Sequence, residues 1–286
     1  PFPKPMCPNH WKSAEDSGLN PRNRRKWTLV GFALVVLGCA AAWWSLEWSQ
    51  ARELRSLVPE TPSLSEHSSR LTRAIRDAET LAMSGSTGEA REGLVRLGRL
   101  YHANGFLDAA RDCWIALRDH DPDEARWHYF LADLHRLNGD EAEIRPLVEA
   151  TVTREPAYAP AWLRLANIAF TEGDFDEAEA TYRKRLDLMP DDAYAMVGLA
   201  RVAMRQGHSE NARGWLERAI NGKPTLSTAH SLLARLESMA GNAEAADRQR
   251  WLATTAGRFR EADDPWIDGL ANWCDDVDRL LVLGSI

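Results

Sequence analysis

The feature that most constrains the fold is a spacing of 34 residues that recurs over residues 105–241. Glycine keeps this interval at five positions: Gly105, Gly139, Gly173, Gly207 and Gly241. Proline keeps the same interval, in a different register, at four positions: Pro122, Pro156, Pro190 and Pro224. Because two residue types follow one period independently, the sequence indicates a structural unit of 34 residues that is repeated along the chain.

A pattern of small and apolar residues recurs inside each unit when the first unit begins at Arg91. Position 7 is always leucine: Leu97, Leu131, Leu165, Leu199 and Leu233. Position 8 is always small: Gly98, Ala132, Ala166, Ala200 and Ala234. The period and this pattern resemble the tetratricopeptide repeat (TPR), a helix–turn–helix unit. The resemblance covers residues 91–260 and implies an all-α fold in which five TPR repeats stack as an α-solenoid.

The chemistry of the repeated positions agrees with this resemblance. Position 8 is small where the two helices of a repeat touch, glycine permits the turn between them, and proline ends the second helix. Three positions depart from the pattern. Ile144 replaces a small residue in the second repeat. The fifth repeat lacks its proline and has Arg250 at an apolar position, as is typical of a terminal repeat.

The segments that flank the repeats are assigned from their composition and spacing. Residues 49–63 are expected to be a linker, and residues 64–90 an N-terminal capping helix followed by a turn. Residues 261–286 are expected to form a C-terminal capping helix or tail, with Trp266 and Trp273 on one apolar stripe. These two tryptophans either cover the last repeat or anchor a partner protein.

Residues 27–48 are predicted to form a transmembrane helix. Residues 27–46 contain no Asp, Glu, Lys or Arg, and they are long enough to span a bilayer. Three tryptophans at the far end suit the membrane interface: Trp43, Trp44 and Trp48. Gly31 and Gly38 give the helix a small-residue face, which either contacts a second membrane helix or faces lipid.

The charges that precede this segment predict its orientation. Residues 1–26 contain six basic and two acidic residues, a net charge of +4, and positive charge beside a span is retained in the cytoplasm. We therefore expect a basic cytoplasmic tail, an uncleaved signal anchor and a single-pass protein of the inner (cytoplasmic) membrane with its TPR domain on the periplasmic side. The alternative is a cleaved signal peptide, whose apolar region would be shorter.

The TPR resemblance implies that the concave face of the solenoid carries positions 2, 5, 9 and 12 of each first helix. The residues expected there as a protein-binding groove are Arg99, Arg126, Tyr129, Arg136, Asn167, Phe170, Arg201 and Arg235. Arginine pairs well with carboxylates, so an acidic segment or a chain terminus is the expected guest. The alternative is that these arginines pair with acidic neighbours such as Glu92 and Asp133.

Several classes of function are not indicated. The whole chain carries a net charge of −7, which leaves −11 outside the basic N-terminal tail and argues against nucleic-acid binding. No motif of a catalytic, metal or cofactor site is present, and no small-molecule substrate is expected. Cys113 and Cys274 either form a disulfide in an oxidising compartment or remain two unrelated thiols.

These features together favour a non-catalytic scaffold for protein–protein interaction. The leading hypothesis is an accessory or structural subunit of an integral-membrane complex, such as a bacterial respiratory or photosynthetic assembly, in contact with protein subunits and the lipid bilayer. The alternative is a membrane-anchored periplasmic chaperone or assembly factor. A third hypothesis is an organellar import receptor with its repeats in the cytosol.

Overall fold

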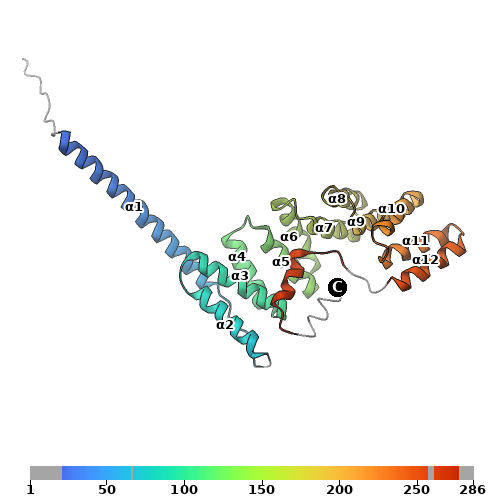
Figure 1. Ribbon diagram of the computed structural model, residues 1–286, viewed down its shortest axis with the longest axis horizontal. Helices are drawn as coiled ribbons and strands as arrows, with labels where there is room; N and C mark the ends of the chain where they lie inside the picture. Colours follow the sequence, from blue (N-terminus) through green and yellow to red (C-terminus); the bar gives the residue numbers. More distant parts are fainter. Residues whose placement is uncertain (1–20, 66, 257–260, 277–286) are drawn as a thin grey trace, which may run out of the picture. The chain divides into compact units, whose positions relative to one another are not determined.

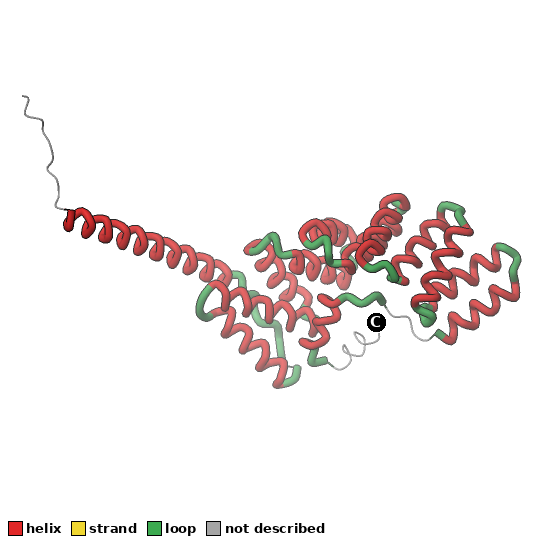
Figure 2. The backbone as a smooth tube through the Cα atoms, turned by 45° about the horizontal axis from the view of Figure 1, so that its top comes forward, coloured by secondary structure: helices red, strands yellow, loops and turns green. Residues whose placement is uncertain are grey.

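The structure is a computed structural model that describes residues 21–65, 67–256 and 261–276, except for the side chains of residues 21–30 and 33. Every regular element in these ranges is a helix (Figures 1 and 2). The chain divides into two compact units, residues 1–50 and residues 51–286. The all-α class predicted from the sequence is confirmed.

Helix α1, Pro21–Ser56, contains the segment predicted to cross a membrane. Among the described residues, no helix combines the length and the apolar character that a membrane span requires. The start of the predicted span, residues 27–30, and the whole predicted basic tail, residues 1–26, lie outside the described side chains. Residues 49–56 are helical where a linker was predicted, and Leu54 is fully buried in the second unit, which explains why the helix continues there.

Five helix pairs follow one another in the second unit (Figure 1). Each pair is one repeat, and consecutive pairs pack on each other. The pairs are α3 (Thr87–Asn104) with α4 (Leu107–His120), α5 (Ala125–Asn138) with α6 (Glu141–Arg154), α7 (Ala159–Glu172) with α8 (Phe175–Leu188), α9 (Ala193–Arg205) with α10 (Ser209–Gly222), and α11 (Ser227–Met239) with α12 (Ala243–Thr255).

The repeated glycines stand at the turn between the two helices of each pair. All five have a positive φ, between 79° and 89°, which places them in the left-handed region that glycine tolerates at no steric cost. The amide of Gly139, for example, donates to the carbonyl of Arg136 as helix α5 ends. The turn predicted from the 34-residue glycine period is therefore present in every repeat.

Helix α2, Ser69–Met83, precedes the repeats and packs against α3. The hydroxyl of Ser68 caps its first turn by accepting from the amide of Leu71 at 3.1 Å. One face of α2 is buried, through Leu71, Ile75, Ala78 and Ala82. The apolar surface of α3 that no earlier repeat covers is thus covered by this helix.

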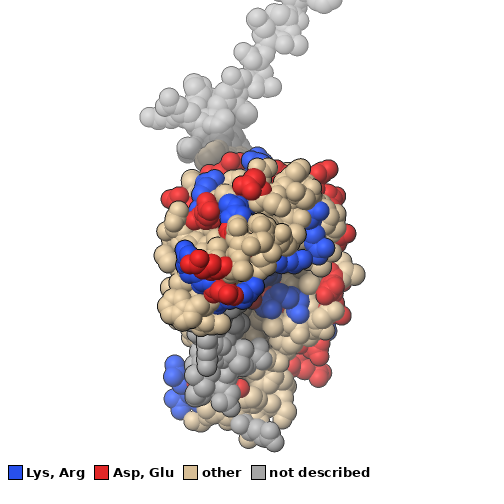
Figure 3. All heavy atoms as spheres, turned by 90° about the vertical axis from the view of Figure 1, so that its right-hand side faces the viewer, with Lys and Arg blue, Asp and Glu red and all other residues tan. Residues whose placement is uncertain are grey.

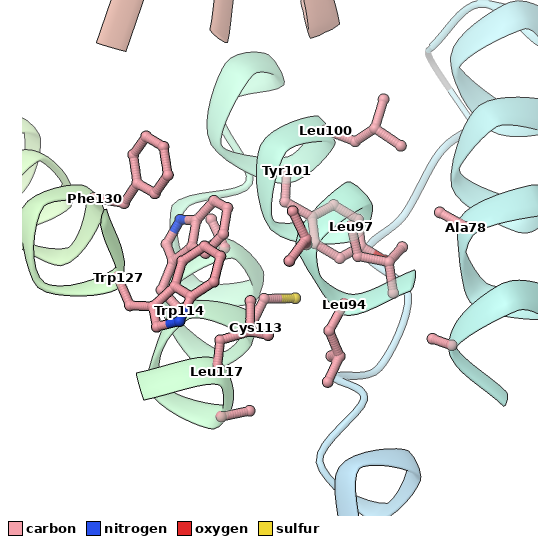
Figure 4. Packing of buried hydrophobic residues seen from close by; sticks show 14 of the residues in the cluster. Ala78, Leu94, Leu97, Leu100, Tyr101, Cys113, Trp114, Leu117, Trp127 and Phe130 are labelled. Carbon is pink, nitrogen blue, oxygen red and sulfur yellow. The ribbon is translucent and has the colours of Figure 1, made fainter. Parts of the chain in front are cut away.

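Aromatic side chains form the centre of the core at the first two repeats (Figure 4). Trp114 of α4 stacks on Trp127 with ring centroids 5.6 Å apart, and on Phe130 at 4.6 Å, both from α5. Leu97 and Tyr101 of α3 are fully buried beside them. Stacked rings of this kind add to the free energy of burial and fix how consecutive repeats pack.

The C-terminal segment differs from the prediction. Instead of a capping helix on the last repeat, the described residues form one α-helical turn, α13 (Pro265–Asp268), and a 3-10 helix, η1 (Gly269–Trp273). These elements contact α3 and α5 of the first two repeats. Leu270 is buried there, whereas Trp251 on α12 of the last repeat is 64% exposed. Burial of apolar side chains explains why the segment lies back along the repeats.

Candidate functional site

The first helices of the repeats line a groove of about 1280 Å³. Its walls come from α3, α5, α7, α9 and α11, as expected for the concave face of a TPR solenoid. Residues 261–276, which we call the tail segment, run along this groove and contact the repeats from the fourth to the first. The short helix of this segment, drawn in red, lies beside α5 in Figure 1. The site is therefore a concave surface with a length of the same chain already placed in it.

The groove contains half of the residues predicted for it. Tyr129, Arg136, Asn167 and Arg201 line it. The other four predicted residues, Arg99, Arg126, Phe170 and Arg235, do not. Two of them have contacts that explain this. Arg126 bonds to Glu124 and lies over the ring of Trp127 at 5.4 Å, while Phe170 is buried beneath the guanidinium of Arg201 at 4.0 Å.

A buried charge cluster stands in the wall of the groove around Asp133, whose side chain is 3% exposed. Its carboxylate lies 3.2 Å from Nε2 of His102, 3.0 Å from Arg136 and 3.3 Å from Arg164. Burial alone would raise the pKa of Asp133, but these neighbours outweigh it and hold the pKa well below its usual range. The pairing of a groove arginine with Asp133, the alternative considered from the sequence, is thus observed for Arg136.

Asp264 of the tail segment is held by three side chains of the second and third repeats, Tyr129, Tyr158 and Arg164, which we call the tyrosine cradle. The hydroxyl of Tyr129 donates to Oδ2 of Asp264 at 2.5 Å, and that of Tyr158 donates to Oδ1. Arg164 lies 3.8 Å from the same carboxyl group and 4.5 Å from the centroid of the Tyr129 ring. The cradle therefore surrounds one carboxyl group with donors from two repeats.

Burial sets the protonation of these groups. It raises the pKa of the Tyr129 and Tyr158 hydroxyls, so both remain donors at neutral pH. It also raises the pKa of Asp264, and the opposing effect of Arg164 and the two hydroxyls offsets this only in part. The carboxyl group thus accepts from two hydroxyls in a place where it has lost much of its contact with water.

Trp266 follows Asp264 by two residues and stacks on the ring of Tyr158, with centroids 3.5 Å apart and planes inclined by 8°. Its backbone amide also donates to the Tyr158 hydroxyl at 3.0 Å. Tyr158 therefore contacts the tail segment through both its ring and its hydroxyl. Trp266 therefore contacts the second repeat and not the last one, through the rings of Tyr129 and Tyr158. Its role as an anchor for a partner protein stays a prediction.

Trp273 holds the far end of the tail segment against the first repeat. Its carbonyl accepts from the side-chain amide of Asn104 at 2.9 Å, and the oxygen of that amide accepts from the backbone of Asp275 at 2.8 Å. Arg99 lies over the indole ring at 5.5 Å. Arg99 is thus a contact of the tail segment even though it lies outside the groove wall.

The near end of the tail segment lies at the fourth repeat. The hydroxyl of Tyr194 donates to the carbonyl of Glu261 at 2.8 Å, and Lys223 donates to the same hydroxyl at 2.7 Å. Within the described part of the chain, neither Lys223 nor Arg201 forms a salt bridge. This part of the groove therefore keeps two positive charges without a carboxylate partner among the described residues.

The sequence did not predict three residues of the site: Tyr158, Arg164 and Asp264. Arg164 occupies position 6 of its repeat and Tyr158 position 34, outside the positions taken for the concave face. The Asp263-Asp264-Pro265-Trp266 stretch is a visible signal, but it reads as the start of a helix. Only the fold shows that Asp264 meets tyrosines more than a hundred residues earlier in the chain.

One alternative from the sequence concerned a disulfide between two cysteines. Cys113 and Cys274 are free thiols, so the disulfide considered between them is not formed.

Across the described residues, no group of three or more His, Cys, Asp or Glu side chains is arranged to hold a metal ion. Figure 3 shows Lys and Arg interspersed with Asp and Glu on one face of the molecule, with no continuous basic surface in that view.

Comparison with known families identifies the repeats. One model of the tetratricopeptide repeat matches residues 95–143 and 145–187, and a second matches residues 169–236. The repeats of this chain are therefore tetratricopeptide repeats, a fold that in general serves as a non-catalytic scaffold for protein–protein interaction. The comparison with curated proteins gave no match.

Solved structures share this fold at low sequence identity. MamA matches with a TM-score of 0.53 and 18% identity over 59% of this chain and 92% of that one. MamA from Desulfovibrio magneticus RS-1, from residue 41 to its end, gives 0.53 and 13% over 58% and 94%. PilF of Pseudomonas aeruginosa gives 0.51 and 16% over 69% and 90%. At these identities the similarity concerns the fold alone.

Proposed function

We propose that this protein is a membrane-anchored TPR scaffold whose groove binds an extended segment of a partner protein, as an accessory subunit of an integral-membrane complex. The observation that carries the proposal is the tail segment, which the groove holds by side chains from several repeats. A surface that accepts one acidic and tryptophan-bearing segment has the chemistry to accept another.

The membrane anchor in this proposal is supported by α1. Among the described residues, its apolar side chains are largely uncovered, and Phe32, Leu37 and Trp43 are each at least 65% exposed. A run of exposed large apolar residues on one helix is suited to lipid or to another membrane helix. A methyl group added to Gly31 or Gly38 would have no described atom within 4 Å, which leaves room for a close helix–helix contact.

The orientation in this proposal follows from charge. The basic residues that precede the apolar segment favour a cytoplasmic N-terminus, which places the repeats on the extracytoplasmic side of the inner membrane. The test is protease digestion of intact and permeabilised spheroplasts. The repeat domain is expected to be cleaved in both, and protection in intact spheroplasts would contradict this orientation.

The partner is tested by purification of the full chain from its native membrane in mild detergent, followed by mass spectrometry. Other membrane-complex subunits are expected in fixed stoichiometry. A monodisperse monomer would refute the accessory-subunit role, and clients in variable, low yield would favour the assembly-factor alternative. Arg201→Glu, inside the groove, should reduce partner recovery, whereas Arg235→Glu, which is exposed outside the groove, should not.

A further inference from the structure

The tyrosine cradle offers more hydrogen-bond donors than the tail segment uses. Two tyrosine hydroxyls converge on the carboxyl group of Asp264. Arg164 lies beside them, and its Nη1 is buried with no acceptor among the described residues. A donor that is buried without a partner is costly and indicates a place where a further acceptor is accommodated. The cradle therefore has the chemistry of a carboxyl-binding pocket.

The contact made by the tail segment is local. Asp264 enters the cradle and Trp266 covers the ring of Tyr158, so one turn of chain supplies both the carboxyl group and the aromatic ring. These interactions depend on the short sequence around Asp264 and not on its covalent link to the repeats. Any protein segment that presents a carboxyl group followed two residues later by an aromatic side chain has the same contacts available to it.

The tail segment is also positioned to compete with such a partner. Helix α12 ends at Thr255, only nine residues before Asp264, and consecutive repeats contact each other directly. A ligand tethered by a short linker has an effective concentration on the order of millimolar. A separate partner must overcome that concentration before it occupies the cradle.

We propose that the tyrosine cradle is the recognition site of the groove for a partner segment with a carboxyl group followed two residues later by an aromatic ring, and that the tail segment is its intramolecular competitor. This inference rests on the proposed function, because it assigns a partner chemistry to the same groove. It adds a regulatory consequence: the cradle is occupied until a partner displaces Asp264 and Trp266.

The probe for this inference is a fluorescein-labelled peptide with the sequence of residues 261–276 and the change Cys274→Ser, which prevents disulfide formation. Its binding to the full chain in detergent is measured by fluorescence anisotropy. Weak binding is expected for the wild type, since the cradle is occupied. In the Trp266→Ala chain the tethered competitor is weakened, and the peptide is expected to bind at least tenfold more tightly.

Changes in the peptide test recognition without affecting the fold of the host. Peptides with Asp264→Asn or Trp266→Ala are expected to bind the Trp266→Ala chain at least tenfold more weakly than the parent peptide. A peptide with Asp268→Asn is the matched control, because Asp268 is exposed and bonds only within the tail segment. Adding Tyr158→Ala to the Trp266→Ala chain should also abolish its tighter binding of the parent peptide, provided that the thermal unfolding of the double variant remains cooperative.

Three outcomes would overturn the inference. The first is equal affinity of the wild-type and Trp266→Ala chains for the peptide, and the second is equal binding of the parent and altered peptides. The third is a dimer that Trp266→Ala dissociates, since the tail segment would then join two copies instead of competing within one. None of these readouts involves a native partner. The loss of partners on Arg201→Glu therefore tests the proposed function separately.

Discussion

Gly98 on α3 faces the indole ring of Trp114 on α4 so closely that a methyl group at Gly98 would lie 2.8 Å from Cη2 of the ring. The ring has little freedom to move, because Trp127 and Phe130 stack against it. The absence of a side chain at position 8 of the first repeat therefore makes room for a tryptophan at position 24.

This contact predicts that Gly98→Ala destabilises the domain. The added methyl group improves helix propensity, but overpacking against a confined ring costs about 1–3 kcal/mol and should prevail. Gly214→Ala is the matched control, because Gly214 lies inside α10 with nothing within 4 Å of the added group. It should stabilise the domain by about 0.5–1 kcal/mol. Urea denaturation followed by circular dichroism measures both, and equal shifts would contradict the argument.

The sequence was sufficient to predict the repeats because their constraints are local. Gly105 and its four counterparts need a positive φ, and position 8 needs a small residue, so both requirements repeat every 34 residues. The continuation of α1 to Ser56 was missed, because the burial of Leu54 depends on residues far along the chain. The 34-residue period therefore predicts only those contacts that recur in every repeat.

A second prediction concerns the buried pair of Arg185 and Asp192. Nε and Nη2 of Arg185 donate to Oδ2 of Asp192 at 3.1 and 2.7 Å, and Oδ1 accepts from the amide of Ala195 at 2.6 Å. Both side chains are at most 5% exposed. Asp192→Ala removes the cap of α9 and leaves a buried guanidinium unpaired, so it should cost about 3–5 kcal/mol.

The matched control for this pair is Asp174→Ala. Asp174 caps α8 by accepting from the amide of Glu177 at 3.0 Å, but it is exposed and has no buried arginine beside it. Loss of a cap alone should cost about 1 kcal/mol. Chemical denaturation of the two variants separates the two contributions. Equal losses would mean that the buried pair adds nothing beyond the cap.

The depressed pKa of Asp133 predicts how the free energy of unfolding changes at acid pH. Because this pKa is depressed in the folded chain, the carboxylate contributes stability that is fully present above the unfolded pKa of about 3.9 and is lost as pH falls through the folded value. Asp133→Asn should therefore lower the free energy of unfolding by about 3–5 kcal/mol at pH 7. The difference from the wild type should narrow steadily below about pH 4.

Urea titrations at a series of pH values measure this difference. Asp108→Asn serves as the control, because the Asp108 side chain is 86% exposed and its bond to Arg111 lies at the surface. The control should remain within about 0.5 kcal/mol of the wild type at every pH. If the difference in the free energy of unfolding between the wild type and Asp133→Asn stays constant down to acid pH, the carboxylate contributes nothing through its charge.

The groove was predicted only in part, because the repeat pattern gives the position of a residue on its helix but not the contacts of its side chain. The family pattern places Tyr129 and Arg201 on the concave face because that placement depends on helix position alone. It cannot show that Arg126 pairs with Glu124, since that choice depends on the local side-chain geometry. Trp266 has helical spacing with Leu270, which fits a capping helix as well as the short turns observed.

The two cysteines of the domain should react at very different rates. Cys113 is fully buried, and burial raises the pKa of its thiol, so almost no thiolate is available to a reagent. Cys274 is only partly covered by its neighbours in the tail segment. In the native chain, N-ethylmaleimide should modify Cys274 within minutes and Cys113 only after denaturation, as measured by peptide mapping with mass spectrometry.

Trp266→Ala should accelerate the labelling of Cys274 and leave Cys113 protected, because it loosens the tail segment without opening the core. Rapid labelling of Cys113 in the native chain, or a bridged Cys113–Cys274 peptide under non-reducing conditions, would contradict this packing.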